Sequence, residues 1–243
     1  MTDSLEMSEP SVTVTAPDGG QTQTAASPPE PGLSEPSPPF HQHVEQRTVV
    51  LPEHHVLFLP IPKAGCTSVL WLLAELAGIP LDTFGHSSLP EVSPGLTIHD
   101  MSLWPAGHRL SDYEGAERER VLGEEGWFRF SVVRDPSPRL WSAWQSKLLL
   151  REPRFVATFG DEPWFPRVPA QPADLVEDFQ RFVVALPTGG AEDVHWSVQH
   201  DLAAQLPLTL VGQVEQLDDT LALLREHVSG DLRLDETRRE NRT

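Results

Sequence analysis

Two short apolar runs in this sequence are each followed by a loop and then by a stretch with helical spacing. The first run, His54–Pro60, precedes the helical stretch Thr67–Ala77. The second run, Trp127–Val133, precedes an Arg-Asp-Pro loop and the helical stretch Pro138–Leu150. Short apolar runs bounded by turn residues are typical of buried strands, and strands that alternate with helices favour a parallel sheet. The pattern therefore predicts a three-layer α/β fold with a central parallel sheet flanked by helices.

The rest of the chain divides into an extension of this pattern and a segment unlike it. The remaining predicted elements are the helices Asp112–Leu122, Ala173–Leu186 and Leu217–Val228 and the strand Leu208–Gly212. Residues 1–45 carry seven acidic side chains and no Lys or Arg, and eight of the 24 prolines precede Phe40. A segment so poor in apolar side chains buries too little surface to offset its ordering entropy. We predict a disordered, acidic, Pro/Ser/Thr-rich tail at 1–46 and one folded domain at 47–243.

Charge and cysteine content exclude several classes of protein. The formal net charge is −18, and a nucleic-acid-binding protein would need clustered Lys and Arg instead. The single cysteine, Cys66, excludes an internal disulfide and a cysteine-rich zinc site, and we predict no metal site. No apolar run approaches the about 18 residues of a membrane span, and the N-terminus lacks a signal-peptide profile. We expect a soluble, cytoplasmic protein that does not span a membrane.

The loop after the first apolar run carries groups that suit an anion. It reads P-K-A-G-C-T-S from Pro62 to Ser68, at the start of a predicted helix, where free N–H groups favour negative charge. Gly65 permits close approach to the backbone, Thr67 adds a hydroxyl donor, and Lys63 adds a positive charge. The loop is not a Walker A motif, because Lys63 precedes the glycine and no upstream glycine exists. A Gly/Pro turn capped by Thr67 is the alternative interpretation.

The loop after the second apolar run places an arginine at a strand end. Arg134 directly follows the predicted strand, at the edge where ligands of open α/β sheets bind. Arg139 and Ser142, three residues apart on one helical face, offer a guanidinium and a hydroxyl that suit a phosphate monoester. The alternative is a surface ion pair of Arg134 with Asp135 and a solvated Arg139. The two tryptophans of this helix are predicted to lie in the core rather than to stack on a base.

Four motifs, in order along the chain, resemble those of the sulfotransferases that use 3′-phosphoadenosine 5′-phosphosulfate (PAPS). They are P-K-x-G-x-T-S at 62–68, F-x-x-V-R-D-P-x-x-R-L-x-S-A at 130–143, H-W-x-V-Q at 195–199 and L-V-G-x-x-E at 210–215. These variants are most similar to the carbohydrate branch, sulfotransferase family 2, which has Pro at the position of Val198. The resemblance runs from about Val56 to the C-terminus and implies a P-loop-like three-layer fold.

The resemblance also implies a role for each residue of the two loops. The 5′-phosphosulfate would be cradled by Lys63, Ala64, Gly65, Cys66, Thr67 and Ser68. Lys63 would neutralise the bridging oxygen as the sulfuryl group leaves, and Cys66 would be a small loop residue rather than a nucleophile. Arg134 and Ser142 would bind the 3′-phosphate. The implied reaction is in-line transfer to a hydroxyl of a carbohydrate or small-molecule acceptor, without a metal.

The acceptor hydroxyl needs a general base near neutral pH, for which histidine is suited. His99, between the two cofactor units, is the first candidate, because the similar heparan sulfate 2-O-sulfotransferases also place a catalytic histidine there. His86 is the second candidate. His195 is interpreted as a structural or substrate-side residue of the H-W motif.

Three further expectations concern location, acceptor and alternatives. The similar animal carbohydrate sulfotransferases are Golgi membrane proteins with luminal disulfides, so we expect a bacterial-type cytoplasmic member. Outside the tail, 29 acidic and 18 basic side chains leave a charge of −11, which would repel a polyanionic glycan and favours a neutral or small acceptor. The alternatives are a P-loop-like nucleotide kinase, which needs a Walker A loop, and a non-catalytic nucleotide-binding protein, which needs neither Lys63 nor a base.

Overall fold

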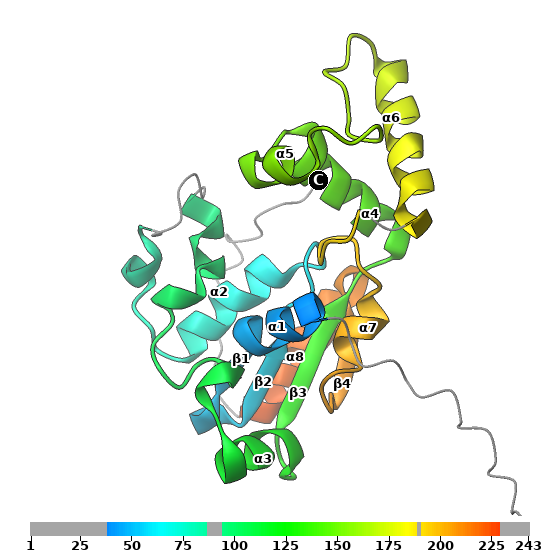
Figure 1. The fold of residues 1–243 in the computed structure, drawn as a ribbon. Helices are drawn as coiled ribbons and strands as arrows, with labels where there is room; N and C mark the ends of the chain where they lie inside the picture. Colours follow the sequence, from blue (N-terminus) through cyan, green and yellow to red (C-terminus); the bar gives the residue numbers. More distant parts are fainter. Residues whose placement is uncertain (1–37, 87–93, 189–190, 229–243) are drawn as a thin grey trace, which may run out of the picture. The chain divides into compact units, whose positions relative to one another are not determined.

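The computed structural model of the protein describes residues 38–86, 94–188 and 191–228 (Figure 1). Its sheet has the order β1-β2-β3-β4. The strands are β1 (Val49–Leu51), β2 (Val56–Leu59), β3 (Phe128–Val133) and β4 (Leu210–Gln213). Strands β2, β3 and β4 run parallel, in a register that pairs Phe58 with Phe130 and Phe130 with Leu210. The three strands predicted from the sequence are confirmed, with ends that differ by one or two residues.

The first strand has no counterpart among the predicted elements. β1 pairs antiparallel with β2, with Val50 opposite Leu57, after a turn in which His55 adopts a φ of 51°. All three residues of β1 are buried. An apolar run this short cannot be recognised as a strand without its partner. The sheet is therefore parallel through β2, β3 and β4 and has an antiparallel edge.

Helices precede, separate and follow the strands. The α-helices are α1 (Pro38–Arg47), α2 (Cys66–Leu76), α3 (Gly115–Gly123), α4 (Pro136–Trp144), α5 (Pro153–Phe159), α6 (Pro172–Ala185), α7 (Gln199–Ala203) and α8 (Leu217–Val228). A π-helical turn, Gln145–Leu149, continues α4. Short 3₁₀ helices lie at Pro52–His54, Leu81–Phe84, Pro94–His99, Met101–Leu103, Leu110–Asp112, Leu186–Thr188 and Val214–Gln216. Within these ranges, no helix combines the length and the apolarity needed to cross a bilayer.

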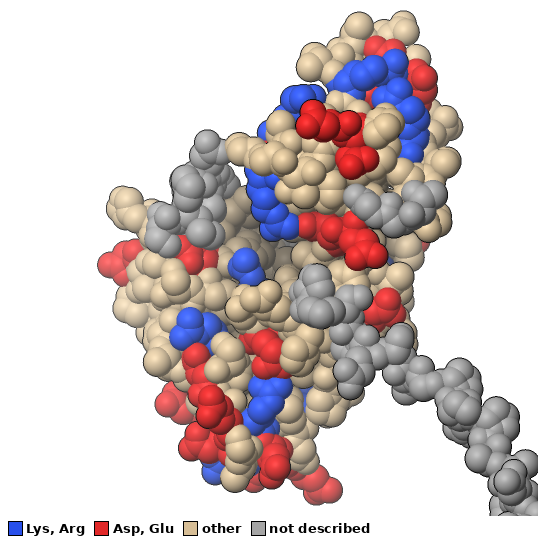
Figure 2. All heavy atoms as spheres, in the orientation of Figure 1, with Lys and Arg blue, Asp and Glu red and all other residues tan. Residues whose placement is uncertain are grey.

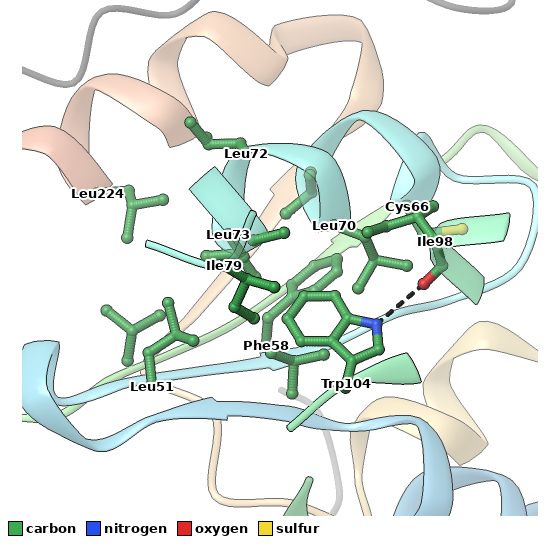
Figure 3. Packing of buried hydrophobic residues seen from close by; sticks show 14 of the residues in the cluster. Leu51, Phe58, Cys66, Leu70, Leu72, Leu73, Ile79, Ile98, Trp104 and Leu224 are labelled. Atoms are coloured by element: carbon green, nitrogen blue, oxygen red, sulfur yellow. Dashed lines mark hydrogen bonds between the residues drawn. The ribbon is translucent and has the colours of Figure 1, made fainter. Parts of the chain in front are cut away.

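Apolar side chains on the two faces of the sheet form two separate clusters. On one face, Phe58 and Phe130 pack with residues of α2 and α8. Figure 3 shows this cluster, in which the Trp104 indole N–H donates a hydrogen bond to the Ile98 carbonyl at 3.0 Å. On the other face, Leu57 packs with residues of α1, α3 and α7, because successive strand residues point to opposite faces. Helices therefore cover both faces, which confirms the three-layer α/β fold.

Helices α4, α5 and α6 have an apolar cluster of their own. Trp144 is fully buried there with Phe155 and Phe182, as predicted for a core residue. Trp141 is 38 % exposed and lies edge-on to the Phe179 ring at 4.9 Å. Figure 1 shows these helices beyond the end of the sheet at which β3 leads into α4. The cluster therefore supplies a second wall near the carboxyl ends of the parallel strands.

The predicted boundary of the tail at residue 46 is wrong for its last nine residues. Residues 38–46 belong to helix α1, whose Val44 is 1 % exposed and packs under the sheet. Glu45 of this helix forms an ion pair with Arg118 of α3 at 2.6 Å. The single buried valine and the long-range ion pair explain why local composition fails to reveal the helix. The rest of the predicted tail, residues 1–37, lies outside the described residues.

We predict that Gly212→Ala lowers the free energy of unfolding by about 2 kcal/mol. A Cβ on Gly212 of β4 would lie 2.1 Å from Thr220 Oγ1, so α8 would have to move away from the sheet. Gly123→Ala, at the exposed end of α3 with open space around it, is the control and should change the free energy by no more than about 1 kcal/mol. Urea unfolding of both variants measures the difference, and equal effects would contradict the contact.

Candidate active site

The loop between β2 and α2 has a backbone suited to close approach of an anion. Lys63 and Gly65 both lie in the left-handed region, with φ values of 68° and 76°. A non-glycine residue is uncommon in this region, and such strained residues cluster at ligand sites. Helix α2 begins at Cys66 with Gly65 as its N-cap, so no cap side chain covers the N–H groups of the first turn. The positive end of the helix dipole therefore faces the loop uncovered by a cap side chain.

The Lys63 side chain points to the π-helical turn that follows α4. Its Nζ donates a hydrogen bond to Ser146 Oγ at 2.9 Å. Burial lowers the pKa of Lys63, and the positive charges of Lys147 and Arg134 lower it further, while Glu152 opposes them. The two lysines of the chain thus lie close enough for the charge of Lys147 to act on Lys63, although they are far apart in the sequence.

The other predicted loop residues differ in burial. Ala64 and Cys66 are buried, whereas Thr67 and Ser68 at the start of α2 are half-buried. Burial raises the pKa of the Cys66 thiol, which disfavours a reactive thiolate. This environment fits the expected role of Cys66 as a small loop residue.

His99 lies against the first turn of α2. Its Nε2 is 2.9 Å from Thr67 Oγ1, and its backbone carbonyl accepts a hydrogen bond from the Arg47 guanidinium. Burial lowers the pKa of His99 to about 4, and the charges of Arg47 and Lys147 add to the shift. Thr67 therefore contacts His99 rather than capping the helix, and the alternative of a capped turn is wrong. The structure brings His99 to the predicted phosphate loop, whereas His86, the second candidate, is exposed.

The turn that carries Arg134 is held by its backbone. Gln199 accepts a hydrogen bond from Arg134 N–H at 2.9 Å through Oε1 and donates one to the Arg134 carbonyl at 2.8 Å through Nε2. Asp135 accepts from Ser137 N–H at 2.9 Å as the N-cap of α4, and Asp135 N–H donates to Glu215 at 3.2 Å. The last residues of the H-W-x-V-Q and L-V-G-x-x-E motifs thus fix this turn.

The Arg134 and Ser142 side chains remain available to a ligand. Both residues are half-buried, and neither the guanidinium nor the hydroxyl forms a hydrogen bond or ion pair with another residue in the described ranges. Asp135 caps α4 and does not pair with Arg134, so the alternative interpretation of a surface ion pair is wrong. The two side chains predicted to bind a 3′-phosphate therefore have no hydrogen-bond or ion-pair partner among the described residues.

The Arg139 side chain, called the clamp below, holds three backbone carbonyl groups together and is not available to a ligand. Its side chain is buried and donates through Nε to the Pro62 carbonyl at 2.9 Å, through Nη1 to the Ser197 carbonyl at 2.8 Å and through Nη2 to the Val194 carbonyl at 3.2 Å. Burial lowers the pKa of Arg139 to about 10, so it stays charged at neutral pH. Both interpretations of Arg139 from the sequence, a phosphate ligand and a solvated side chain, are wrong. The (i, i+3) spacing with Ser142 cannot reveal that one side chain turns inward.

Two polar pairs near the loop were not predicted as site residues. His195 Nδ1 lies 2.6 Å from Asp193 Oδ1, and Lys147 Nζ lies 2.6 Å from Glu152 Oε2. Both pairs meet the Phe155 ring, which is 5.5 Å from the His195 ring centroid and 5.6 Å from Lys147 Nζ. The scarcity of lysine in this sequence and the acid two residues before His195 are the signals that could have suggested them.

Charged side chains of both signs border the site. Figure 2 shows a hollow over the start of α2 and below α5, with Lys and Arg atoms and also Asp and Glu atoms on its rim. The described residues include no group of three or more His, Cys, Asp or Glu side chains placed to hold a metal ion. The arrangement is suited to bind an anionic group at the α2 loop and a second one at Arg134.

Comparison with known proteins identifies similar sequences. A family model described as the sulfotransferase family matches residues 46–241. Carbohydrate sulfotransferase 10 of Homo sapiens is 34% identical over 127 residues, which cover 52% of this chain and 31% of that protein. The same-named proteins of Gallus gallus and Xenopus laevis are 29% and 30% identical over 199 and 206 residues, covering 72% and 75% of this chain and 50% and 53% of theirs. The chain thus matches between 31% and 53% of the length of these relatives, and no solved structure matches it.

We predict that Arg139→Met lowers the free energy of unfolding by about 3 kcal/mol, because three half-buried carbonyl groups lose a charged donor. Arg120→Met, at an exposed position of α3, removes the same charge and should cost less than about 0.5 kcal/mol. Urea unfolding of the two variants measures the difference. A small effect of Arg139→Met would show that the clamp adds little to the fold.

Proposed function

The chain belongs to the sulfotransferase family, and we propose that it transfers a sulfuryl group from PAPS to a hydroxyl of a carbohydrate or a small molecule. Membership of the family supports sulfuryl transfer, and the donor, the acceptor class and the roles of individual residues are further parts of the proposal.

The observation that supports the donor is the position of two anion-binding loops on neighbouring strands. Leu59 of β2 pairs with Ser131 of β3 in a parallel register, so the loop with Lys63 and the turn with Arg134 leave the sheet at the same edge. Ligands of open α/β sheets bind at this edge. PAPS carries a phosphosulfate on its 5′ side and a phosphate on its 3′ side, which fits two separate anion sites.

On the 5′ side, the proposal assigns binding to the backbone and side chains of the α2 loop. The N–H groups of the first turn of α2 and the hydroxyls of Thr67 and Ser68 would hold the 5′-phosphate. PAPS supplies a sulfuryl group whose departure leaves negative charge on the bridging oxygen. Lys63 is suited to neutralise this charge, because it belongs to the loop and its ammonium donates a hydrogen bond to the neutral hydroxyl of Ser146.

On the 3′ side, Arg134 and Ser142 would bind the phosphate that distinguishes PAPS from other adenine nucleotides. Their side chains have no partner within the described ranges, so binding requires no existing contact there to break. The turn is already fixed by Gln199 and Glu215, which lowers the ordering cost of binding.

The acceptor is proposed from the relatives and from charge. The matched relatives are named carbohydrate sulfotransferases, which supports a glycan or another hydroxyl compound as acceptor. The charge of −11 outside residues 1–45 favours a neutral acceptor. A cytoplasmic location and a bacterial-type origin stay predictions. A nucleotide kinase is disfavoured, because the sequence lacks a Walker A loop.

We predict that the protein binds the desulfated product, 3′-phosphoadenosine 5′-phosphate (PAP), at least about 100-fold more tightly than AMP, which lacks the 3′-phosphate. Isothermal titration calorimetry with both nucleotides measures this ratio. Arg134→Ala should remove most of the preference for PAP and leave the affinity for AMP unchanged. Lys63→Ala should weaken both nucleotides by a similar factor, since it acts on the 5′ side.

Arg120→Ala, which removes an exposed positive charge on α3, is the control for net charge and should leave the ratio unchanged. An Arg134→Ala variant that still prefers PAP would contradict the assignment of the 3′-phosphate. Tighter binding of Mg-ATP than of PAP would favour the kinase alternative.

A further inference from the structure

We infer that His195, oriented by Asp193, is the general base that takes the proton from the acceptor hydroxyl. This inference rests on the proposed sulfuryl transfer and names a residue of the same site. His99 is the base expected from the sequence, so the two histidines make different predictions.

The His195 imidazole is oriented by the Asp193 carboxylate. Its Nδ1 is 2.6 Å from Asp193 Oδ1, and its backbone N–H donates to the same oxygen at 2.9 Å. Asp193 also accepts a hydrogen bond from Arg154 of α5, which holds the carboxylate in place. A carboxylate at Nδ1 fixes the tautomer in which Nδ1 carries the proton and Nε2 carries a lone pair.

The other ring nitrogen of His195, Nε2, remains accessible. It has no hydrogen-bond partner within the described ranges, it is not among the buried unpaired atoms, and 17 % of the side chain is exposed. By contrast, His99 Nε2 is engaged with Thr67 Oγ1, and His43 Nε2 is 3.4 Å from the Pro60 carbonyl. Of these three half-buried histidines, His195 alone combines an orienting carboxylate with a ring nitrogen that has no partner among the described residues.

The Arg139 clamp links the segment that carries His195 to the loop between β2 and α2. One guanidinium, that of Arg139, bonds the carbonyls of Pro62 and Val194, the residues directly before Lys63 and His195. On the other side, the His195 ring and the Lys147 ammonium both contact Phe155. The charge of Lys147 lowers the pKa of both Lys63 and His195, and Lys63 and His195 both lower the pKa of His99, so these side chains lie close enough to act on one another.

Burial favours the neutral form of His195 at neutral pH. Burial lowers the pKa of His195 below 6.5, Asp193 opposes the shift, and Lys147 and Arg154 add to it. His195 in turn acts on the titration of His99 and His43. A base must be unprotonated to act, so transfer should fall as the pH drops through the pKa of His195 and should reach a plateau above it.

In the proposed step, the acceptor hydroxyl receives the sulfuryl group and gives its proton to His195. The acceptor oxygen forms a bond to sulfur while its proton moves to His195 Nε2. The bond between sulfur and the bridging oxygen breaks, and its electron pair stays on the 5′-phosphate of PAP beside Lys63. The proton leaves His195 to solvent before the next turnover.

The decisive variant is His195→Asn. The asparagine amide nitrogen can occupy the position of Nδ1 and donate to Asp193, but nothing replaces Nε2. We predict that the single-turnover transfer rate falls at least about 100-fold and loses its acidic limb, while the affinity for PAP stays within about twofold. The acceptor is the first compound that the wild type sulfates in a panel of monosaccharides, disaccharides and small alcohols. His200→Asn, at an exposed position of α7, is the matched control and should keep the wild-type rate.

A second measurement needs no acceptor. Nitrogen-15 NMR of the imidazoles should show His195 as the Nδ1-protonated tautomer at pH 7, and Asp193→Asn should abolish this preference. An Nε2-protonated or charged His195 at pH 7 would overturn the inference. A His195→Asn variant with a near wild-type rate, together with a large loss in His99→Asn, would assign the base to His99 instead. If the wild type fails to bind PAP at all, the proposed function fails first, and the calorimetric arm reports this separately.

Discussion

The arrangement of the site depends on one buried guanidinium. Arg139 joins the carbonyl of Pro62, at the start of the phosphate loop, to those of Val194 and Ser197, in the segment that carries His195. A charged donor with three carbonyl acceptors is stable in a buried setting because its hydrogen-bonding groups are matched by acceptors that would otherwise be unpaired. The clamp thus connects the loop after β2, helix α4 and the chain before α7.

The same logic explains the other motif residues, which serve the turn of Arg134. Gln199 holds both polar groups of the Arg134 backbone, Glu215 accepts from Asp135 N–H, and Gly212 permits α8 to pack against β4. These residues contact other parts of the protein and are not assigned to the ligand. They leave Arg134 and Ser142 with no partner in the described ranges, so the groups that remain available on this edge of the sheet are those suited to an anion.

Local sequence patterns predicted the fold well and the contacts of the site only in part. Apolar runs and helical spacing located β2, β3, β4 and five of the helices, because those signals depend on a few neighbouring residues. Helices α1, α5 and α7 and strand β1 were not predicted. For α1 and β1 the reason is that their stability comes from Val44, Glu45 and the partner strand. The phosphate loop and Arg134 were found from residue type and position, whereas the inward turn of Arg139, the contact of Thr67 with His99 and the meeting of Lys147 with Lys63 depend on tertiary packing that spacing cannot encode.

We propose that these residues form a transferase and not only a nucleotide-binding site. The experiment is to incubate the full chain with PAPS carrying a radioactive sulfate, together with neutral sugars, acidic sugars and small alcohols. We expect label to appear in at least one acceptor, PAP to accumulate in equal amount, and a neutral acceptor to be preferred to an anionic one. Tight binding of PAP with no labelled product from any acceptor would overturn the proposal and identify the protein as a binding module.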